Sequence, residues 1–204
     1  LRLSGASEAA RIACKGLRCT ICAKDARAKL PRPTRIRTQT GEFNATVYSD
    51  VGSIKDSAGT TFDFVVCVDE GTDWTVVILI DNHRPEEFYR ACEQGWINFA
   101  GPPDVLVADG ERGYAAAEFV TKLAHAGSMY VPTAAYAPWQ KGKVERKIES
   151  VKAIIRKTVL FMGLKGRQDM LVAGIEAANA VNHRPGPTGM SPAMLLFGQR
   201  LKLY

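Results

Sequence analysis

The spacing of hydrophobic and polar residues predicts three β-strands first, followed by alternating helices and strands. The segment 61–68 places Phe62, Phe64, Val66 and Val68 at every second position, which is the period of a β-strand with two different faces. Another contains the longest apolar run, Val76–Ile80, which is long enough for a buried strand and far too short to cross a membrane. Together they predict a meander of three strands at residues 46–54, 61–68 and 74–80.

Helical and strand patterns alternate in the following residues. We expect helices at 85–99, 115–126 and 143–162, and strands at 104–109 and 129–132. In the first helix Phe88, Cys92 and Trp96 recur at every fourth position, so they should face the core. The order β-β-β-α-β-α-β-α predicts an α/β fold, with a mixed five-stranded sheet and helices on both faces.

The last of these helices carries two neighbouring stripes. Its apolar stripe should face the core and comprises Val144, Ile148, Val151, Ile155 and Val159. One position further on lies a charged stripe of Glu145, Glu149, Lys152 and Arg156. This spacing places Glu145 at the edge of the core, within reach of the sheet. Lys152 and Arg156 lie further along the same face, where a DNA phosphate could bind.

Two acidic residues occupy unusual positions on the predicted strands. Asp50 lies inside the first strand, although Asp is depleted in strands and a buried carboxylate without a partner is costly. A nearby cation would remove that cost. Asp109 ends the apolar run 104–109, where ligand sites of parallel sheets lie. The simpler alternatives are a strand-edge acid for Asp50 and an Asp-Gly turn for Asp109.

These two carboxylates and Glu145 form a plausible ligand set for phosphoryl transfer. Two strand acids and one helix acid provide hard oxygen ligands, which suit Mg²⁺ or Mn²⁺, whereas zinc hydrolases use His or Cys. Two such ions roughly 3.5–4 Å apart can stabilise the attacking and leaving oxygens. The alternative for Glu145 is a helix-dipole acid. We take Glu111 and Glu149 to be solvated.

Charge is distributed unevenly along the chain, whose formal net charge is +6. Basic residues concentrate in 24–37 and 141–157, whereas acids dominate 42–135. An acidic body with basic edges suggests a bound polyanion, although solvated helix faces and a linker are the simpler explanation. The five cysteines are odd in number and no secretory signal is evident, so we expect a reducing, intracellular location without disulfides or a membrane span.

Longer motifs then connect these residues to a family. Residues 110–144 separate Asp109 from Glu145, which makes 35 intervening residues. Tyr136, Pro138 and Gly142 lie nine, seven and three residues before Glu145, and a Thr-Gly-Met-Ser-Pro segment begins at residue 188. Over roughly residues 14–200 the chain resembles the catalytic core of retroviral and long-terminal-repeat retrotransposon integrases, the D,D-35-E group of the RNase H-like superfamily.

The resemblance implies a function and the residues that perform it. Asp50, Asp109 and Glu145 would be the catalytic residues and the ligands of two Mg²⁺ or Mn²⁺ ions. The activity would be DNA 3′-end processing followed by strand transfer, with element ends and target DNA as partners. Tyr136 and Lys141 would contact DNA from a mobile loop that Gly142 makes flexible. We further expect a homo-oligomer, a nuclear location or a nucleoprotein particle, and an origin in a polyprotein.

The resemblance also divides the chain into three parts. Residues 1–40 would be the remnant of an N-terminal zinc module with a basic linker, 41–163 the catalytic core, and 164–204 its C-terminal helical extension. Cys19 and Cys22 have zinc-knuckle spacing, but the histidines that complete such a module precede this pair in the family. The histidines of this chain all follow the pair, so we expect zinc only in a longer chain, with Cys14 as a possible third thiol.

Three alternatives remain open. The chain could be another RNase H-like transposase or nuclease, a domesticated DNA-binding or assembly module without activity, or a zinc-dependent nucleic-acid-binding fragment. The complete set of three acids favours an enzyme, and the Thr-Gly-Met-Ser-Pro segment favours an integrase.

Overall fold

The computed structural model describes residues 7–17, 19–21, 42–109, 112–133, 138–186 and 188–199. The side chains of Arg11, Arg112 and residues 138–144 are outside this description.

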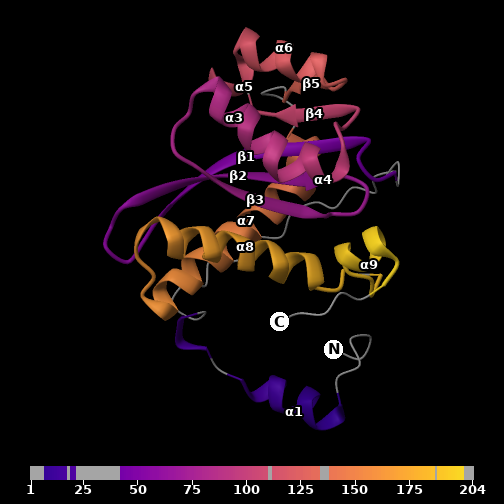
Figure 1. Cartoon of the computed structure of the whole chain (residues 1–204). Helices are drawn as coiled ribbons and strands as arrows, with labels where there is room; N and C mark the ends of the chain where they lie inside the picture. Colours follow the sequence, from indigo (N-terminus) through magenta and orange to yellow (C-terminus); the bar gives the residue numbers. More distant parts are fainter. Residues whose placement is uncertain are drawn as a thin grey trace.

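A mixed five-stranded sheet forms the centre of the molecule (Figure 1). Its strand order is β3-β2-β1-β4-β5. The first three strands are antiparallel, and β4 and β5 continue the sheet in parallel with β1. The predicted fold class is therefore confirmed. The strands are β1 (Thr46–Lys55), β2 (Thr61–Asp69), β3 (Thr75–Ile80), β4 (Val105–Ala108) and β5 (Met129–Pro132).

Several short helices cover one face of the sheet (Figure 1). Phe88, Trp96 and Phe119 are almost completely buried there, in a core shared with Val47 and Leu106 of the sheet. The predicted inward positions of Phe88, Cys92 and Trp96 are thus confirmed. The helices are α3 (Pro85–Cys92), the π-helix η1 (Glu93–Ile97), α4 (Asn98–Ala100), α5 (Arg112–Ala115) and α6 (Ala117–His125).

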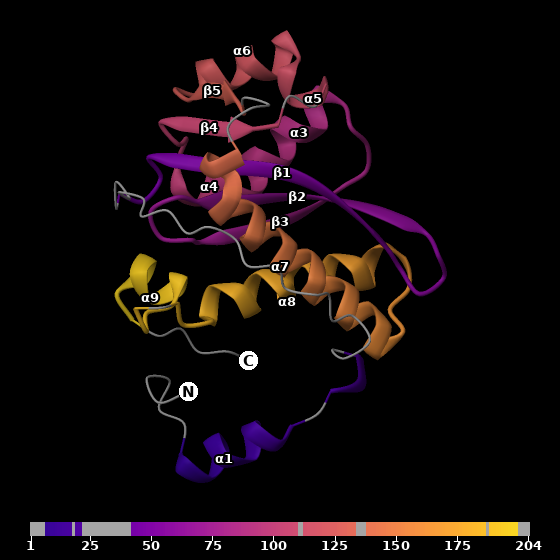
Figure 2. The same ribbon diagram turned by 180° about the vertical axis from the view of Figure 1, so that it is seen from behind.

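Two long helices, α7 (Pro138–Met162) and α8 (Gly166–His183), cover the opposite face (Figure 2). In α7 the apolar stripe is buried as predicted, since Ile148, Val151, Ile155 and Val159 are at most 3% exposed. They pack against Tyr48 and Ile54 of β1 and against α8. The core therefore fixes which side of α7 faces the sheet, and with it the direction of the charged stripe.

Two predicted helices prove to be interrupted. The helix expected at 85–99 contains the π-helix η1, in which Gly95 lies so close to Ile78 that a Cβ would be 2.4 Å from its Cγ1. The helix expected at 115–126 is split into α5 and α6 at Ala116, whose backbone is extended. The close approach of Gly95 to Ile78 of β3 is a packing contact that hydrophobic spacing alone does not reveal.

The helix that carries Glu145 also begins earlier than predicted. The sequence suggested a loop up to Gly142 and a helix from 143, but α7 begins at Pro138 and contains Gly142. Proline is well tolerated in the first turn of a helix, and a single glycine costs only about 1 kcal/mol in its interior. Glu145 consequently lies about two turns inside α7, so the alternative of a helix-end acid is wrong.

Further helices lie near both ends of the described chain. Near the N-terminus, α1 (Glu8–Gly16) begins after Ser7, whose side chain accepts a hydrogen bond from the backbone N–H of Ala10. After α8, the short helix α9 (Pro192–Phe197) begins at Ser191, which caps it through the N–H of Met194. Since α8 contributes to the central core, the C-terminal extension is packed on the sheet.

Candidate metal-binding active site

The sheet places Asp50 and Asp109 side by side on the same face. Along β1, Asp50 alternates with Val51 and shares its face with Tyr48 and Ile54, the residues beneath α7. The parallel pairing of β1 with β4 ends at Ser49 and Ala108. One residue further on, the same register brings Asp50 next to Asp109, at the carboxyl end of β4.

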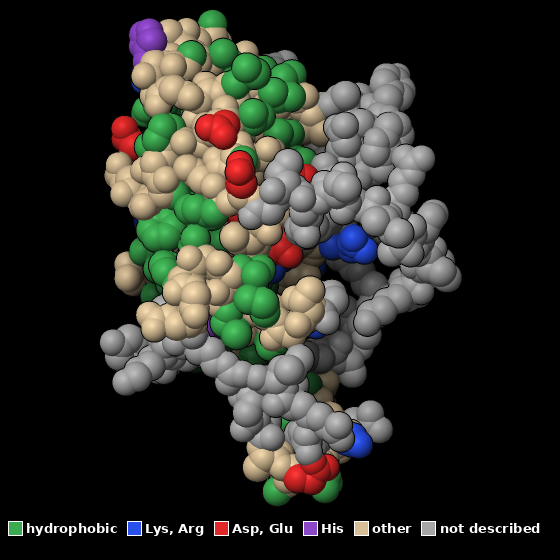
Figure 3. Space-filling view, turned by 90° about the vertical axis from the view of Figure 1, so that its right-hand side faces the viewer, with side chains coloured by type: hydrophobic (Ala, Val, Ile, Leu, Met, Phe, Trp, Pro, Cys, Tyr) green, Lys and Arg blue, Asp and Glu red, His purple; other side chains and the backbone are tan. Residues whose placement is uncertain are grey.

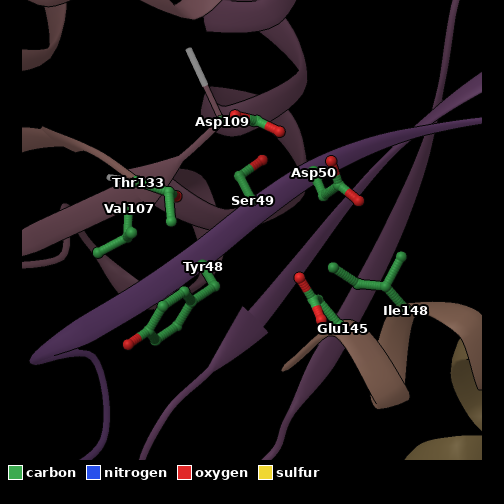
Figure 4. Close-up of a pocket in the computed structure, with 8 residues that line it drawn as sticks. All are labelled: Tyr48, Ser49, Asp50, Val107, Asp109, Thr133, Glu145 and Ile148. Carbon is green, nitrogen blue, oxygen red and sulfur yellow. The ribbon is translucent and has the colours of Figure 1, made fainter. Parts of the chain in front are cut away.

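Glu145 reaches this position from the helix that covers the face. Its neighbour one turn on, Ile148, is 3% exposed and packs into the core beside Tyr48. This anchor directs Glu145 toward the edge of the sheet. Figure 4 shows the carboxylates of Asp50, Asp109 and Glu145 around one pocket, as the sequence predicted.

The pocket is small and lined by oxygen ligands. Its volume is about 130 Å³, below the roughly 300–1,000 Å³ of typical small-molecule sites. Such a space suits a hydrated ion better than an organic cofactor. The lining residues are Tyr48, Ser49, Asp50, Val107, Asp109, Thr133, Glu145 and Ile148.

The chemistry of this donor set fits Mg²⁺ or Mn²⁺. Its acidic ligands are carboxylates, and no His or Cys is among the described residues that line the pocket, so the set does not suit zinc. The three acids line one pocket without forming a closed cage. Within the described ranges, no group of three or more His, Cys, Asp or Glu side chains is arranged to hold a metal ion.

Sequence reasoning missed two hydroxyl residues of the pocket, Ser49 and Thr133. The Ser49 hydroxyl is hydrogen-bonded to the hydroxyl of Tyr114 at 2.5 Å, and Thr133 Oγ1 donates to the carbonyl of Ala108 at 3.1 Å. Burial raises the pKa of Tyr114 well above its usual value, so this phenol stays protonated. Thr133 directly follows β5, as Asp109 follows β4, and that parallel could have identified it.

Lys152 lies at the rim of the pocket. Its Nζ is 3.8 Å from Asp50 Oδ2 and 3.6 Å from Glu149 Oε1, and its side chain is 18% exposed. The charged stripe predicted on α7 therefore exists. However, Glu149, which we expected to be simply solvated, pairs with Lys152. Arg156 follows on the same stripe, and its buried Nε has no hydrogen-bond partner within the described structure.

Other residues that were predicted to contact DNA or zinc lie outside the part of the chain that the structure describes. Tyr136 and Cys22 lie outside the described residues, and so does the side chain of Lys141. Figure 3 shows one side of the molecule, where separate Asp and Glu side chains lie among hydrophobic and neutral ones and described Lys and Arg side chains are few. The described basic residue that lies at the rim of the pocket is Lys152 of α7.

Two other acids, Asp56 and Asp69, are structural. Asp56 accepts hydrogen bonds from the backbone N–H groups of Ala58, Thr60 and Gly166, all at 2.9 Å. Asp69 is fully buried and accepts from the backbone of Asn44 and Thr72. Their oxygens satisfy loop backbone, which separates them from the pocket acids.

The cysteines have no metal partner in the described structure. Cys14 and Cys19 are exposed, and Cys67 and Cys92 are buried. A separate search of the helices in the described residues found none long and apolar enough to span a membrane.

Comparison with known proteins rests on structure. No protein-family model and no curated protein sequence matches the chain. The catalytic core of HTLV-2 integrase, solved with magnesium in a trimeric form, superposes with a TM-score of 0.63 and 19% identity over 74% of this chain and 95% of that one. The catalytic core of BIV integrase gives a TM-score of 0.61 and 14% identity over 76% and 95%.

A longer match comes from an assembled complex. A chain of the simian T-cell lymphotropic virus intasome, solved with the PP2A regulatory subunit B56 gamma, superposes with a TM-score of 0.69 and 18% identity. The match covers 99% of this chain and 74% of that one. These likenesses, all below 25% identity, show the class of fold: an α/β fold with a mixed five-stranded sheet flanked by helices. More particularly, the chain has the fold of a retroviral integrase catalytic core.

Proposed function

We propose that this chain is the catalytic domain of an integrase of the retrotransposon type, a divalent-metal-dependent polynucleotidyl transferase. The observation that carries the proposal is the convergence of Asp50, Asp109 and Glu145 on one pocket, in a fold shared with integrase cores. The magnesium complex of the HTLV-2 core supports Mg²⁺ as the metal here. Bound to these carboxylates, divalent ions would supply Lewis-acid stabilisation of the attacking and leaving oxygens.

The reaction would consist of two in-line displacements. First, the oxygen of water attacks a phosphorus near the DNA 3′ end, and the bond to the departing 3′ oxygen breaks. In the second step, the new 3′-hydroxyl attacks a target phosphodiester, which releases the target's own 3′-hydroxyl. No side chain forms a covalent bond to DNA. The three carboxylates would hold the divalent ions in position, and Lys152 and Arg156 would position DNA phosphates.

The same proposal also implies binding partners and a location in the cell. The HTLV-2 core was solved in dimeric and trimeric forms, and the simian virus chain belongs to an intasome. We infer that this chain also self-associates and binds element ends and target DNA. It would work in the nucleus or in an intracellular nucleoprotein particle.

Conservative replacement of each acid tests the proposal. Asp50→Asn, Asp109→Asn and Glu145→Gln keep side-chain size but remove an anionic ligand, so each should abolish Mn²⁺-dependent cleavage and joining of a DNA duplex without altering the fold. Asp104→Asn is the matched control, because this exposed residue lies just before the opposite end of β4. Near-wild-type activity in any of the three variants would remove that residue from the ligand set.

A further inference from the structure

The side chain of Lys152 crosses β1 directly over Gly52. A Cβ at Gly52 would lie 2.2 Å from Cε of Lys152 and 3.2 Å from its Cδ and Nζ. Any larger residue at position 52 would therefore occupy the space of the lysine stem. Because Gly52 and Asp50 are two residues apart on one strand, they lie on the same face. The missing side chain at Gly52 thus opens a path for Lys152 toward Asp50.

The ammonium group at the end of this path lies between two carboxylates. Lys152 Nζ is 3.8 Å from Asp50 Oδ2 and 3.6 Å from Glu149 Oε1. Both distances exceed those of a direct hydrogen bond, so the attraction is mainly electrostatic. The Lys152 side chain is 18% exposed and that of Asp50 is 38% exposed. A partly exposed pair of this kind is weak and can be exchanged for another partner.

Building on the proposed function, in which Asp50 is a metal ligand, we propose that Lys152 regulates metal binding by competing with the divalent ion for Asp50. An ammonium and a divalent ion beside the same carboxylate repel each other strongly in a small, partly enclosed pocket. The ion therefore displaces the ammonium. The long, flexible stem of lysine lets the ammonium move away from Asp50 without any change in α7.

This exchange would link metal binding to DNA binding. A displaced Lys152 ammonium remains on the rim of the pocket, where it can pair with a DNA phosphate. Since coupling between two ligands is reciprocal, a phosphate that holds Lys152 away from Asp50 would favour the metal in turn. Lys152 would thus favour metal loading when DNA is present and oppose it when DNA is absent.

Direct measurement of Mn²⁺ binding without DNA tests the competition. Free Mn²⁺ is followed by electron paramagnetic resonance in titrations of the full chain and its variants. Lys152→Met keeps the stem and removes the charge, and should bind Mn²⁺ about two- to fivefold more tightly, as expected for release of a weak ion pair. Lys55→Met is the matched control. Lys55 is exposed and lies about 16 Å from Asp50 along β1, which is beyond the screening length of charges in physiological salt.

Gly52→Ala provides a second variant that keeps the lysine. Its Cβ meets only the distal part of the flexible lysine stem, so the strand should be retained while Lys152 moves away from Asp50. We expect Gly52→Ala to tighten Mn²⁺ binding in the same direction. If Gly52 acts through Lys152, the double variant should bind like Lys152→Met alone. An unchanged affinity in Gly52→Ala would refute the role given to this glycine.

Asp50→Asn separates failure of this inference from failure of the proposed function. If Asp50→Asn weakens Mn²⁺ binding while Lys152→Met leaves it unchanged or weakens it, the acids bind metal and the competition is refuted. If Asp50→Asn binds Mn²⁺ as the wild type does, Asp50 is not a ligand and both proposals fall. Equal tightening in Lys55→Met and Lys152→Met would reduce the effect to net charge, which also refutes the competition.

Discussion

Asn182 pairs with the backbone of Thr75 as a neighbouring β-strand would. Its Oδ1 accepts the Thr75 N–H at 2.8 Å, and its Nδ2 donates to the Thr75 carbonyl at 2.7 Å. Both residues are buried, and Thr75 begins the edge strand β3. The C-terminal helix α8 thus satisfies an edge of the sheet. It also supports α7, which carries Glu145.

We expect Asn182→Ala to lower the free energy of unfolding by about 3 kcal/mol. The reason is that the buried N–H and C=O of Thr75 would both lose their partner. Urea denaturation followed by circular dichroism measures the loss. Asn182→Asp is a useful comparison, since it keeps the acceptor but removes the donor to Thr75. A loss below about 1 kcal/mol in Asn182→Ala would show that water replaces the side chain.

Asp56 should make stability depend on acid pH. The backbone N–H of Gly166, followed by those of the 56–60 turn, holds the pKa of Asp56 below its usual value. Its contribution is therefore complete above the unfolded-state pKa of about 4 and is lost as pH falls through the lower folded-state pKa. Asp56→Asn should melt at a lower temperature at pH 7, because its amide N–H₂ faces the N–H of Gly166.

The same variant should be less sensitive to acid than the wild type. Melting temperatures measured from pH 7 down to pH 3 should begin to converge for Asp56→Asn and the wild type below about pH 4, because the wild type starts to lose the Asp56 contribution there. Asp104→Asn, in which an exposed carboxylate is removed, should stay parallel to the wild type. If the curves for Asp56→Asn and the wild type stay parallel, protonation of Asp56 does not reduce the stability of the fold.

DNA binding should depend on the basic residues of α7. Lys152→Ala and Arg156→Ala each remove one expected phosphate contact, so each should reduce the slope of log affinity against log salt by roughly one unit. Fluorescence anisotropy with a labelled duplex at several salt concentrations gives this slope. Lys55→Ala should leave it unchanged. An unaltered slope in the Lys152/Arg156 double variant would mean that this stripe contacts only solvent.

The cysteine pair should not hold zinc in this chain. Cys19→Ser and Cys22→Ser should alter neither melting temperature nor catalysis, because the three histidines of this chain all lie far downstream of the pair. Metal analysis of the purified chain should find no stoichiometric zinc. One tightly held equivalent that disappears in Cys19→Ser would contradict this expectation, since structural zinc contributes folding energy directly.

The sequence determined the kind and order of the elements. Strand alternation and helical spacing reflect one-sided burial, so they are local signals that survive in the unfolded chain. The four described apolar positions of α7 are buried as predicted, and so are Phe88, Cys92 and Trp96. The boundaries of the helices and strands were predicted less accurately. The π-helix at Gly95, for example, lies against Ile78 of β3, a contact between elements that are separated in the sequence.

The sequence alone also identified Asp50, Asp109 and Glu145, because a carboxylate in a strand or at its end is unusual and their spacing matches a known family. Only the tertiary structure added Ser49 and Thr133 to the pocket. It alone also placed Lys152 beside Asp50, through the space left at Gly52, a residue far away along the chain. Contacts of this kind are decided by strand register and helix packing. These bring distant side chains within a few ångströms and leave no periodic pattern in the sequence.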